Sequence, residues 1–132
     1  MKKAWADGTQ CPFGILAAGS GKFLGVISIN HIVHTNQLAN VGYWVRSTCT
    51  KQGIASRAGR LGTQYAFQER GLTRLEIACI PGNSASRRVA EKLGAKLEAI
   101  SRNRLVMHGR AYDAALYALT PEDIALDPRL GI

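Results

Sequence analysis

The chain has 132 residues, 46% of them apolar, which suffices for the core of one folded domain and leaves little room for a second. No apolar run is long enough to cross a bilayer, and no apolar segment follows the basic N-terminal residues, so neither a membrane helix nor a signal peptide is expected. Seventeen Lys and Arg residues against nine Asp and Glu give a net charge of +8, which favours an anionic partner without distinguishing nucleic acid, a membrane surface or a phosphorylated small molecule.

Cysteine and histidine usage gives no sign of a metal site. The chain contains three cysteines, at Cys11, Cys49 and Cys79. They lie far apart, and their odd number favours a reducing compartment, so we expect a cytoplasmic location. The histidines, His31, His34 and His108, also lack metal-type spacing and are expected in loops, with His108 at a turn.

The first part of the chain predicts three strands. Two strand-sized apolar runs, Phe13–Ala17 and Phe23–Ile29, flank Ala18-Gly19-Ser20-Gly21, which is typical of a hairpin turn. A polar loop is expected from His31 to Gln37. The alternating segment Ala39–Val45 then predicts a third strand.

From Ile54 the apolar period lengthens to that of a helix, which Gly71 is placed to stop. The inward face is expected to carry Ile54, Ala58, Leu61, Gly62, Tyr65 and Ala66. Gly59 and Gly62 inside this helix lower its propensity, so we expect a neighbouring element to approach closely there.

The second half repeats strand and helix signals. Leu75–Ile80 predicts a fourth strand, and Asn83 is a good N-cap for a second helix that Gly94 would stop. Lys96–Ile100 and Ala114–Leu119 predict two final strands. The order β-β-β-α-β-α-β-β places the chain in the α/β (α+β) class, with a mixed, mostly antiparallel sheet, a central parallel β-α-β unit and flanking helices.

The segment from Lys51 to Ser56 is the first candidate for ligand binding. A polar loop follows a strand here, and a helix begins at Gly53. Free N–H groups and the positive end of the helix dipole favour a phosphate at such a position. The segment matches neither a Walker loop nor a dinucleotide fingerprint, and an ordinary loop with a lone glycine would explain it equally well.

Three segments together match a known family in residue type and spacing: Asn40–Val45, Gln52–Ala55 and, most specifically, the twelve residues Asn83–Gly94. On these residues the chain resembles the GNAT superfamily of N-acetyltransferases, and within it the branch of ribosomal-protein N-terminal acetyltransferases. The resemblance runs from about Phe13 to Leu119. It implies acetyl-CoA as cosubstrate, no metal, and direct acetyl transfer to a primary amine, either a protein N-terminus or a small amine.

The resemblance also implies roles for individual residues. It assigns acetyl-CoA contacts to Val45, Lys51, Gln52, Gly53, Ile54, Ala55, Ser56, Asn83 and Ser86. The pyrophosphate would lie on the loop 51–56, and the pantetheine arm would pair with the free strand edge at Val45. Ser86 would act as the general acid that protonates the leaving thiolate, although Asn83 and Ser86 also suit a helix N-cap and first turn on their chemistry alone. Glu76 and Asp113 are the remaining candidates for the general base.

The chain departs from the family at its start. Family members open with a strand and a helix before the first hairpin, and residues 1–12 could supply only the end of that wall. We therefore expect one GNAT-like domain over residues 1–132 that lacks the opening strand and helix. An exposed sheet edge and apolar surface would follow, which predicts a homo-oligomer.

Two other functions stay open at this point. One is a GNAT-fold module that binds coenzyme A with little or no turnover. The other is a basic RNA- or ribosome-binding domain, which ranks lowest because the chain has no RNP-type aromatic motif and no dense basic stripe.

Overall fold

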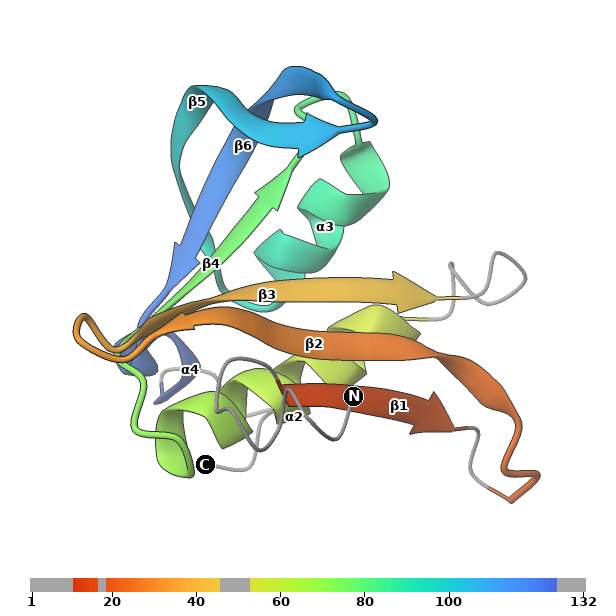
Figure 1. Cartoon of the computed structure of the whole chain (residues 1–132). Helices are drawn as coiled ribbons and strands as arrows, with labels where there is room; N and C mark the ends of the chain where they lie inside the picture. Colours follow the sequence, from red (N-terminus) through yellow and green to blue (C-terminus); the bar gives the residue numbers. More distant parts are fainter. Residues whose placement is uncertain (1–10, 17–18, 46–52, 126–132) are drawn as a thin grey trace.

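The structure is a computed structural model that describes residues 11–16, 19–45 and 53–125 (Figure 1). In chain order the elements are β1 (Cys11–Leu16), β2 (Phe23–Val33), β3 (Leu38–Val45), α2 (Ile54–Gln68), β4 (Arg74–Cys79), α3 (Ser84–Lys92), β5 (Lys96–Met107), β6 (Arg110–Leu119) and α4 (Pro121–Ala125). This confirms the predicted order and adds the short α4. None of the described helices is long and apolar enough to span a membrane.

One six-stranded sheet organises the molecule, with the order β1-β2-β3-β4-β6-β5. Neighbouring strands are antiparallel except for β3 and β4, which run parallel on either side of the α2 crossover. The α/β class and the mixed sheet with one parallel β-α-β unit are therefore confirmed.

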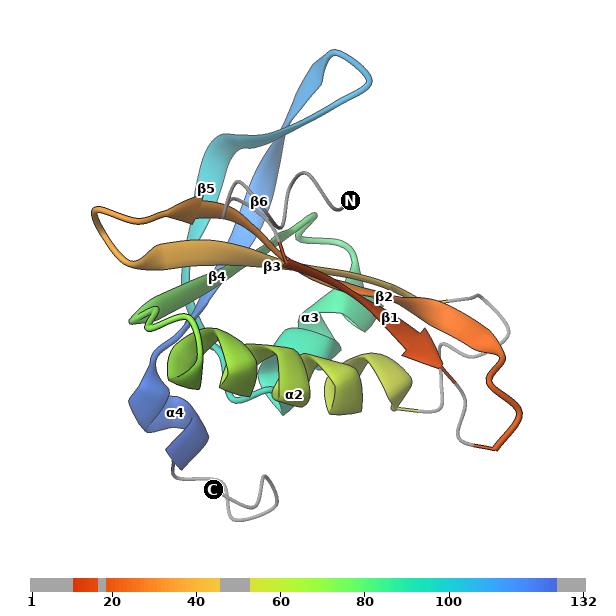
Figure 2. The ribbon, with the colours of Figure 1, turned by 60° about the horizontal axis from the view of Figure 1, so that its bottom comes forward.

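The two long helices, α2 and α3, lie on the same side of the sheet (Figure 2). Strand alternation explains how the core forms there, because successive side chains point to opposite faces. On β4 the residues Leu75, Ile77 and Cys79 are buried with Ala66 of α2 and Leu93 of α3. The intervening residues of β4 face the other side, which we call the open face.

Close packing at two glycines of α2 confirms the expectation drawn from the sequence. A Cβ atom at Gly62 would lie 2.9 Å from Cγ2 of Ile27 on β2, and one at Gly59 would lie 2.9 Å from Cδ2 of Leu93 on α3. The predicted inward position of Leu61 is wrong, because its side chain is 71% exposed. Leu61 instead borders a groove beside β1, where α2 reaches the edge of the sheet.

Strand β2 runs further than predicted. The prediction that a loop begins at His31 is wrong, because β2 continues to Val33 and the turn occupies only residues 34–37. The pairing of β2 with β3 is irregular between Asn30 and Val33, and His31 there has a left-handed φ of 51°. This β-bulge lets Ile32 still reach the core.

Strand β5 also extends through an irregularity that the sequence pattern did not predict. Its pairing with β6 shifts between Ser101 and Leu105, and Asn103 has a φ of 51°. The backbone N–H of Asn103 donates to Oδ1 of Asp113 across the pair at 3.1 Å. Beyond this second bulge the hairpin closes at His108, as predicted.

Candidate functional site

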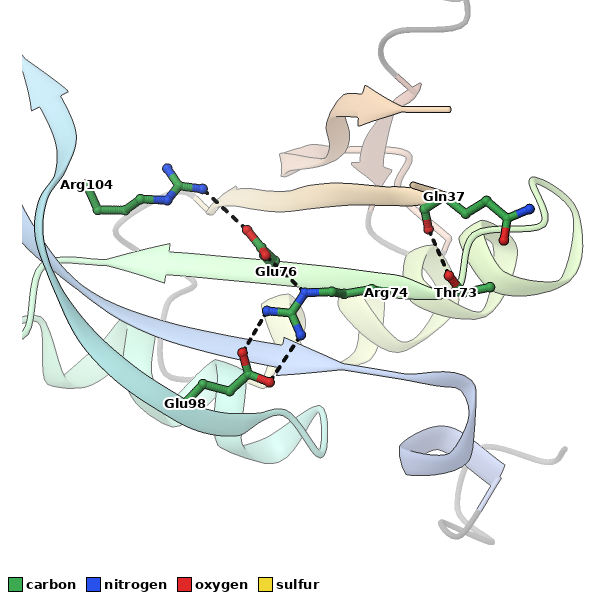
Figure 3. Close-up of polar contacts among 6 residues, drawn as sticks. All are labelled: Gln37, Thr73, Arg74, Glu76, Glu98 and Arg104. Atoms are coloured by element: carbon green, nitrogen blue, oxygen red, sulfur yellow. Dashed lines mark hydrogen bonds and ion pairs between the residues drawn. The ribbon is translucent and has the colours of Figure 1, made fainter. Parts of the chain in front are cut away.

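The parallel strands β3 and β4 form a fork that is closed at one end and open at the other. Only Leu38–Asn40 of β3 pair with Arg74–Glu76 of β4, although β3 continues to Val45 and β4 to Cys79. At the closed end the backbone oxygen of Gln37 accepts hydrogen bonds from N–H and Oγ of Thr73, at 2.7 and 3.3 Å (Figure 3). Beyond Asn40 and Glu76 the facing strand edges are available for another partner.

The start of α2 presents free backbone donors near the open end of the fork. Gly53 forms the N-cap with a left-handed φ of 70°, and no side chain among residues 11–16, 19–45 and 53–125 caps the helix. The N–H groups of the first turn, including those of Ala55 and Ser56, therefore stay available for an anion at the positive end of the helix dipole. Lys51 and Gln52, the other predicted residues of this loop, lie outside the described residues.

A cavity of about 280 Å³, which we call the helix-side cavity, separates the start of α2 from α3. It is lined by Gly53, Ala55, Ser56, Ala85, Arg88, Val89 and Lys92. Two cationic side chains from α3 thus share a cavity with the uncapped helix N-terminus, which suits a phosphorylated ligand. The side chain of Ile54, also a predicted contact, is buried in the core, so only its backbone is placed to take part.

Ser86 is held in place by groups from two elements. Its backbone N–H donates to Oδ1 of Asn83 at 3.1 Å, which confirms Asn83 as the N-cap of α3. The Tyr43 hydroxyl on β3 donates to the backbone oxygen of Ser86 at 2.8 Å and lies 3.1 Å from its Oγ. Burial raises the pKa of Tyr43 to about 12, although the hydrogen bond with Ser86 opposes the shift.

The sequence reasoning did not identify Tyr43 as a site residue. Its contact with Ser86 spans 43 positions of the chain, so no local spacing could reveal it. Cys79 lies close by and is buried, and burial raises the pKa of its thiol. Cys79 therefore packs as a small apolar residue of the core.

Arg87 has a structural role that differs from the one the sequence suggests. Its spacing from Glu91 predicts a surface ion pair, but the Tyr117 hydroxyl lies between the two side chains. Arg87 Nε donates to that hydroxyl at 3.0 Å, and the hydroxyl donates to Oε2 of Glu91 at 3.2 Å. Arg87 Nη1 also donates to the backbone oxygen of Pro81 at 3.0 Å, which fixes the turn that leads into α3.

Four charged side chains make a network on the open face (Figure 3). The Glu76 carboxylate pairs with Nε of Arg74 at 3.0 Å and with Nη2 of Arg104 at 3.4 Å. Arg74 also donates to both Glu98 oxygens through Nη2 and Nη1, at 2.6 and 3.1 Å, and this hydrogen bonding lowers the pKa of Glu98. Glu76 thus lies at the closed end of the fork with both oxygens engaged, and its role as a base stays a prediction.

The other groups considered for chemistry lie apart from the fork. Asp113, the second candidate base, is exposed and accepts from the Asn103 backbone. Within residues 11–16, 19–45 and 53–125, no group of three or more His, Cys, Asp or Glu side chains is placed to hold a metal ion.

Comparisons with known proteins agree on one family. Residues 1–96 match the family described as "Acetyltransferase (GNAT) domain". YdaF of Bacillus subtilis, a candidate ribosomal N-acetyltransferase, is 33% identical over 118 residues, which are 89% of this chain and 63% of YdaF. The ribosomal-protein-serine acetyltransferase of Escherichia coli is 33% identical over 97 residues, or 74% of this chain and 54% of the relative.

Solved structures give the same result. Mycobacterium smegmatis RimJ, in complex with CoA-disulfide, superposes with a TM-score of 0.83 at 31% identity, covering 92% of this chain and 58% of RimJ. The chain spans 63% and 54% of the length of the two curated relatives named above.

Proposed function

The chain belongs to the GNAT acetyltransferase family, and we propose that it moves the acetyl group of acetyl-CoA directly to a primary amine. The observation that supports this most is the fork between β3 and β4, whose open end lies next to the uncapped start of α2 and the cations of the helix-side cavity. These residues fit a ligand that combines an extended amide chain with phosphate groups.

Each part of acetyl-CoA has a proposed partner. The first-turn N–H groups of α2 would bind the pyrophosphate together with Lys51 and Gln52, and Arg88 and Lys92 would add charge-assisted contacts. The free edge of β3 at Val45 would pair with the amides of the pantetheine arm, in the manner of an added strand. Asn83 already uses Oδ1 for capping, so its side-chain NH₂ is the group left for the arm.

Ser86, positioned by Tyr43, is proposed to protonate the leaving thiolate. The amine attacks the thioester carbonyl, the C–S bond breaks, and the sulfur must gain a proton while the nitrogen loses one. The Tyr43 hydroxyl donates its hydrogen to the Ser86 backbone oxygen. The Tyr43 oxygen can therefore accept a hydrogen bond from Ser86 Oγ–H, and this bond can break when Oγ–H turns away. Ser86 Oγ–H can therefore turn to the sulfur from a fixed starting position, and a backbone N–H near Val45 would polarise the carbonyl.

The engagement of Glu76 favours a second candidate, a module that binds acetyl-CoA with little turnover. Its carboxylate is shared by two arginines, so it is not poised as a free base. Release of free thiol in the presence of a panel of amines separates the two functions, because the module would bind acetyl-CoA without releasing thiol above the rate of the protein-free control.

Calorimetric titration of acetyl-CoA tests the proposed cofactor site, with Gly53→Glu as the test and Gly71→Glu as the matched control. Both glycines have a left-handed φ, 70° and 67°, so both variants carry similar backbone strain of about 1 kcal/mol. Only Gly53→Glu puts a carboxylate at the start of α2. We expect acetyl-CoA to bind the intact chain and Gly71→Glu but not Gly53→Glu, and absence of binding to the intact chain would contradict the proposal.

Self-association and a cytoplasmic location are also proposed. Among the described strands β1 pairs only with β2, and beside its free edge lies a groove of about 340 Å³. The groove is lined by Gly14, Ile15, Leu16, Ile27, Ala58, Leu61 and Gly62. A second copy of the chain would cover this apolar edge, and light scattering that shows only monomer at micromolar concentration would contradict it. The reduced Cys79 is consistent with the cytoplasm.

A further inference from the structure

A second cavity, of about 370 Å³, opens on the face of the sheet opposite α2 and α3, and we call it the open-face cavity. It is lined by His31, Asn40, Ala78, Arg104 and Leu105. We propose that this cavity receives the acceptor, and that the acceptor is a primary amine that also carries a carboxylate. The inference rests on the acetyl transfer proposed above, because it specifies the amine that such a transfer would use.

The position of the open-face cavity relative to the fork suits a second substrate. Asn40 is the last residue of β3 that pairs with β4, and Ala78 lies beyond the pairing, where the strands have separated. The neighbour of Ala78, Cys79, faces the opposite side of the sheet and interacts with Ser86. An amine in the open-face cavity would therefore approach the fork from the side away from Ser86, where the leaving thiolate is proposed to lie.

Backbone strain is concentrated at this cavity. Among the described residues four that are not glycine have a left-handed φ: His31, Gln37, Asn103 and His108. Gln37 and His108 lie in turns, where such a φ is ordinary. His31 and Asn103 instead lie inside strands, at the bulges of β2 and β5, and the cavity is lined by His31 and by the residue that follows Asn103. Such strain costs about 1–3 kcal/mol per residue and gathers at functional sites, where bulges redirect side chains.

The charges around the cavity favour a carboxylate over a polyamine. Arg104 is the charged residue of the lining, whereas the nearby carboxylates of Glu76 and Glu98 are already ion-paired. A polycationic acceptor requires unpaired carboxylates, and none of the five residues that line the cavity carries one, since Asp113 at the β5 bulge lies outside the lining. The net charge of +8 acts in the same direction by attracting acidic substrates.

Arg104 is free enough to bind such an acceptor. Within the described part of the chain its ion-pair partner is Glu76, at the long distance of 3.4 Å, and its side chain is 43% exposed. The guanidinium presents donors that fit a carboxylate in a two-bond arrangement. Asn40 donates to Oδ1 of Asn30 at 3.0 Å, which holds its side chain at the cavity wall.

Two sources could supply this chemistry, a free amino acid or a peptide N-terminus followed by an acidic residue. The test is kcat/KM for matched acceptors in which only one member carries a carboxylate: the C-terminally amidated peptides Ser-Asp-Ala and Ser-Asn-Ala, the free amino acid alanine and alaninamide, and spermidine. The wild type should prefer the acidic member of one pair by about tenfold, the equivalent of one charge-assisted contact. The pair that shows the preference identifies the source.

Variants of Arg104 connect that preference to the cavity. Arg104→Gln should reduce the acid-to-amide ratio to about one, and Arg104→Lys should retain part of it because the charge remains while the planar fork is lost. Arg104→Glu should shift the preference toward spermidine, a reversal that a merely structural role would not produce. Arg102→Gln is the control, since it removes the same charge from an exposed position of the same strand and should leave the ratio unchanged.

Binding measurements separate failure of this inference from failure of the proposed transfer. Calorimetry of the acidic acceptors is repeated with coenzyme A present, for wild type and Arg104→Gln. Binding that depends on Arg104, without thiol release, would support the cavity and contradict the transfer. Turnover of amines with no acidic preference, a preference for spermidine, or a ratio insensitive to Arg104→Gln would overturn the inference and leave the transfer standing. The inference would also be overturned if no acidic acceptor were either bound or turned over.

Discussion

The two faces of the sheet differ in how they are built. The face under α2 and α3 has an apolar core of alternating strand residues, and hydrogen bonds with Tyr43, Pro81 and Tyr117 join α3 to that core at its edge. The open face carries a charged network and two strained bulges, and its residues come from four strands. Apolar packing therefore forms most of one face, whereas charged contacts between strands form the other, as expected of a site that recognises a polar acceptor.

The largest effect is expected from removing the proposed acid on the helix side. Ser86→Ala should lower kcat about 10²-fold, the lower end for general acid–base catalysis, and should change the Kd of acetyl-CoA by less than about threefold. Ser84→Ala, at an exposed position of the same first turn, should leave kcat unchanged. Stopped-flow measurement of thiol release checks both variants. Equal rates for Ser86→Ala and the wild type would remove Ser86 from the chemistry.

Packing on the helix side is tested by the two glycines of α2. Gly62→Ala should destabilise the fold by about 1–3 kcal/mol, because the new methyl meets the branched and buried Ile27. Gly59→Ala should cost less, since the δ-methyls of Leu93 can turn away and Ala improves helix propensity by about 1 kcal/mol. Urea denaturation of both variants measures the difference. A larger loss at Gly59 would show that the α2–α3 contact, and not the α2–β2 contact, is the tighter one.

The sequence predicts the helix-covered face well because its signals are local. The cap at Asn83 and the position of Ser86 lie three residues apart, and the glycines of α2 mark close packing without any knowledge of the partner. The parallel unit follows from one strand-helix-strand pattern. Short α4 was missed, although Thr120 with Asp123 three residues later makes a capping pair at 2.8 Å.

The open face was predicted poorly because its contacts are long-range. Arg104 reaches Glu76 across 28 positions, and no spacing rule links them. The bulges at His31 and Asn103 extend β2 and β5 beyond the apolar runs that predicted them, since exposed edge positions carry no apolar periodicity. The one available signal is residue type, because Asn and His adopt a left-handed φ more readily than most residues.

A smaller effect is expected from Tyr43 at alkaline pH. Its folded pKa of about 12 exceeds the unfolded value of 10.0, so its contribution to stability is complete below pH 10 and is lost as the pH rises towards 12. Two pKa units correspond to at most about 2.7 kcal/mol. The free energy of unfolding of the wild type should therefore fall relative to that of Tyr43→Phe over this range. Parallel curves for the two proteins would contradict the assigned burial.

The smallest effect concerns the open-face network. The pKa of Glu98 is lowered by Arg74, so the stability it provides is present above its unfolded pKa and disappears as the pH falls through the folded value. The pair is partly exposed, which limits the effect to about 0.5 kcal/mol. Glu98→Gln should be less stable than the wild type at neutral pH and equal to it in acid. A difference that persists in strong acid would indicate packing and not charge.

The most direct test of the two-face account is a crossed measurement of two variants, Arg88→Ala on the helix side and Arg104→Gln on the open face. Calorimetry gives the Kd of acetyl-CoA, and steady-state kinetics with the preferred acidic amine gives the acceptor KM. The account predicts that Arg88→Ala weakens acetyl-CoA by about three- to tenfold with little change in the acceptor KM, and that Arg104→Gln does the reverse. If both variants altered the same constant, the two substrates would share one face and the account would be contradicted.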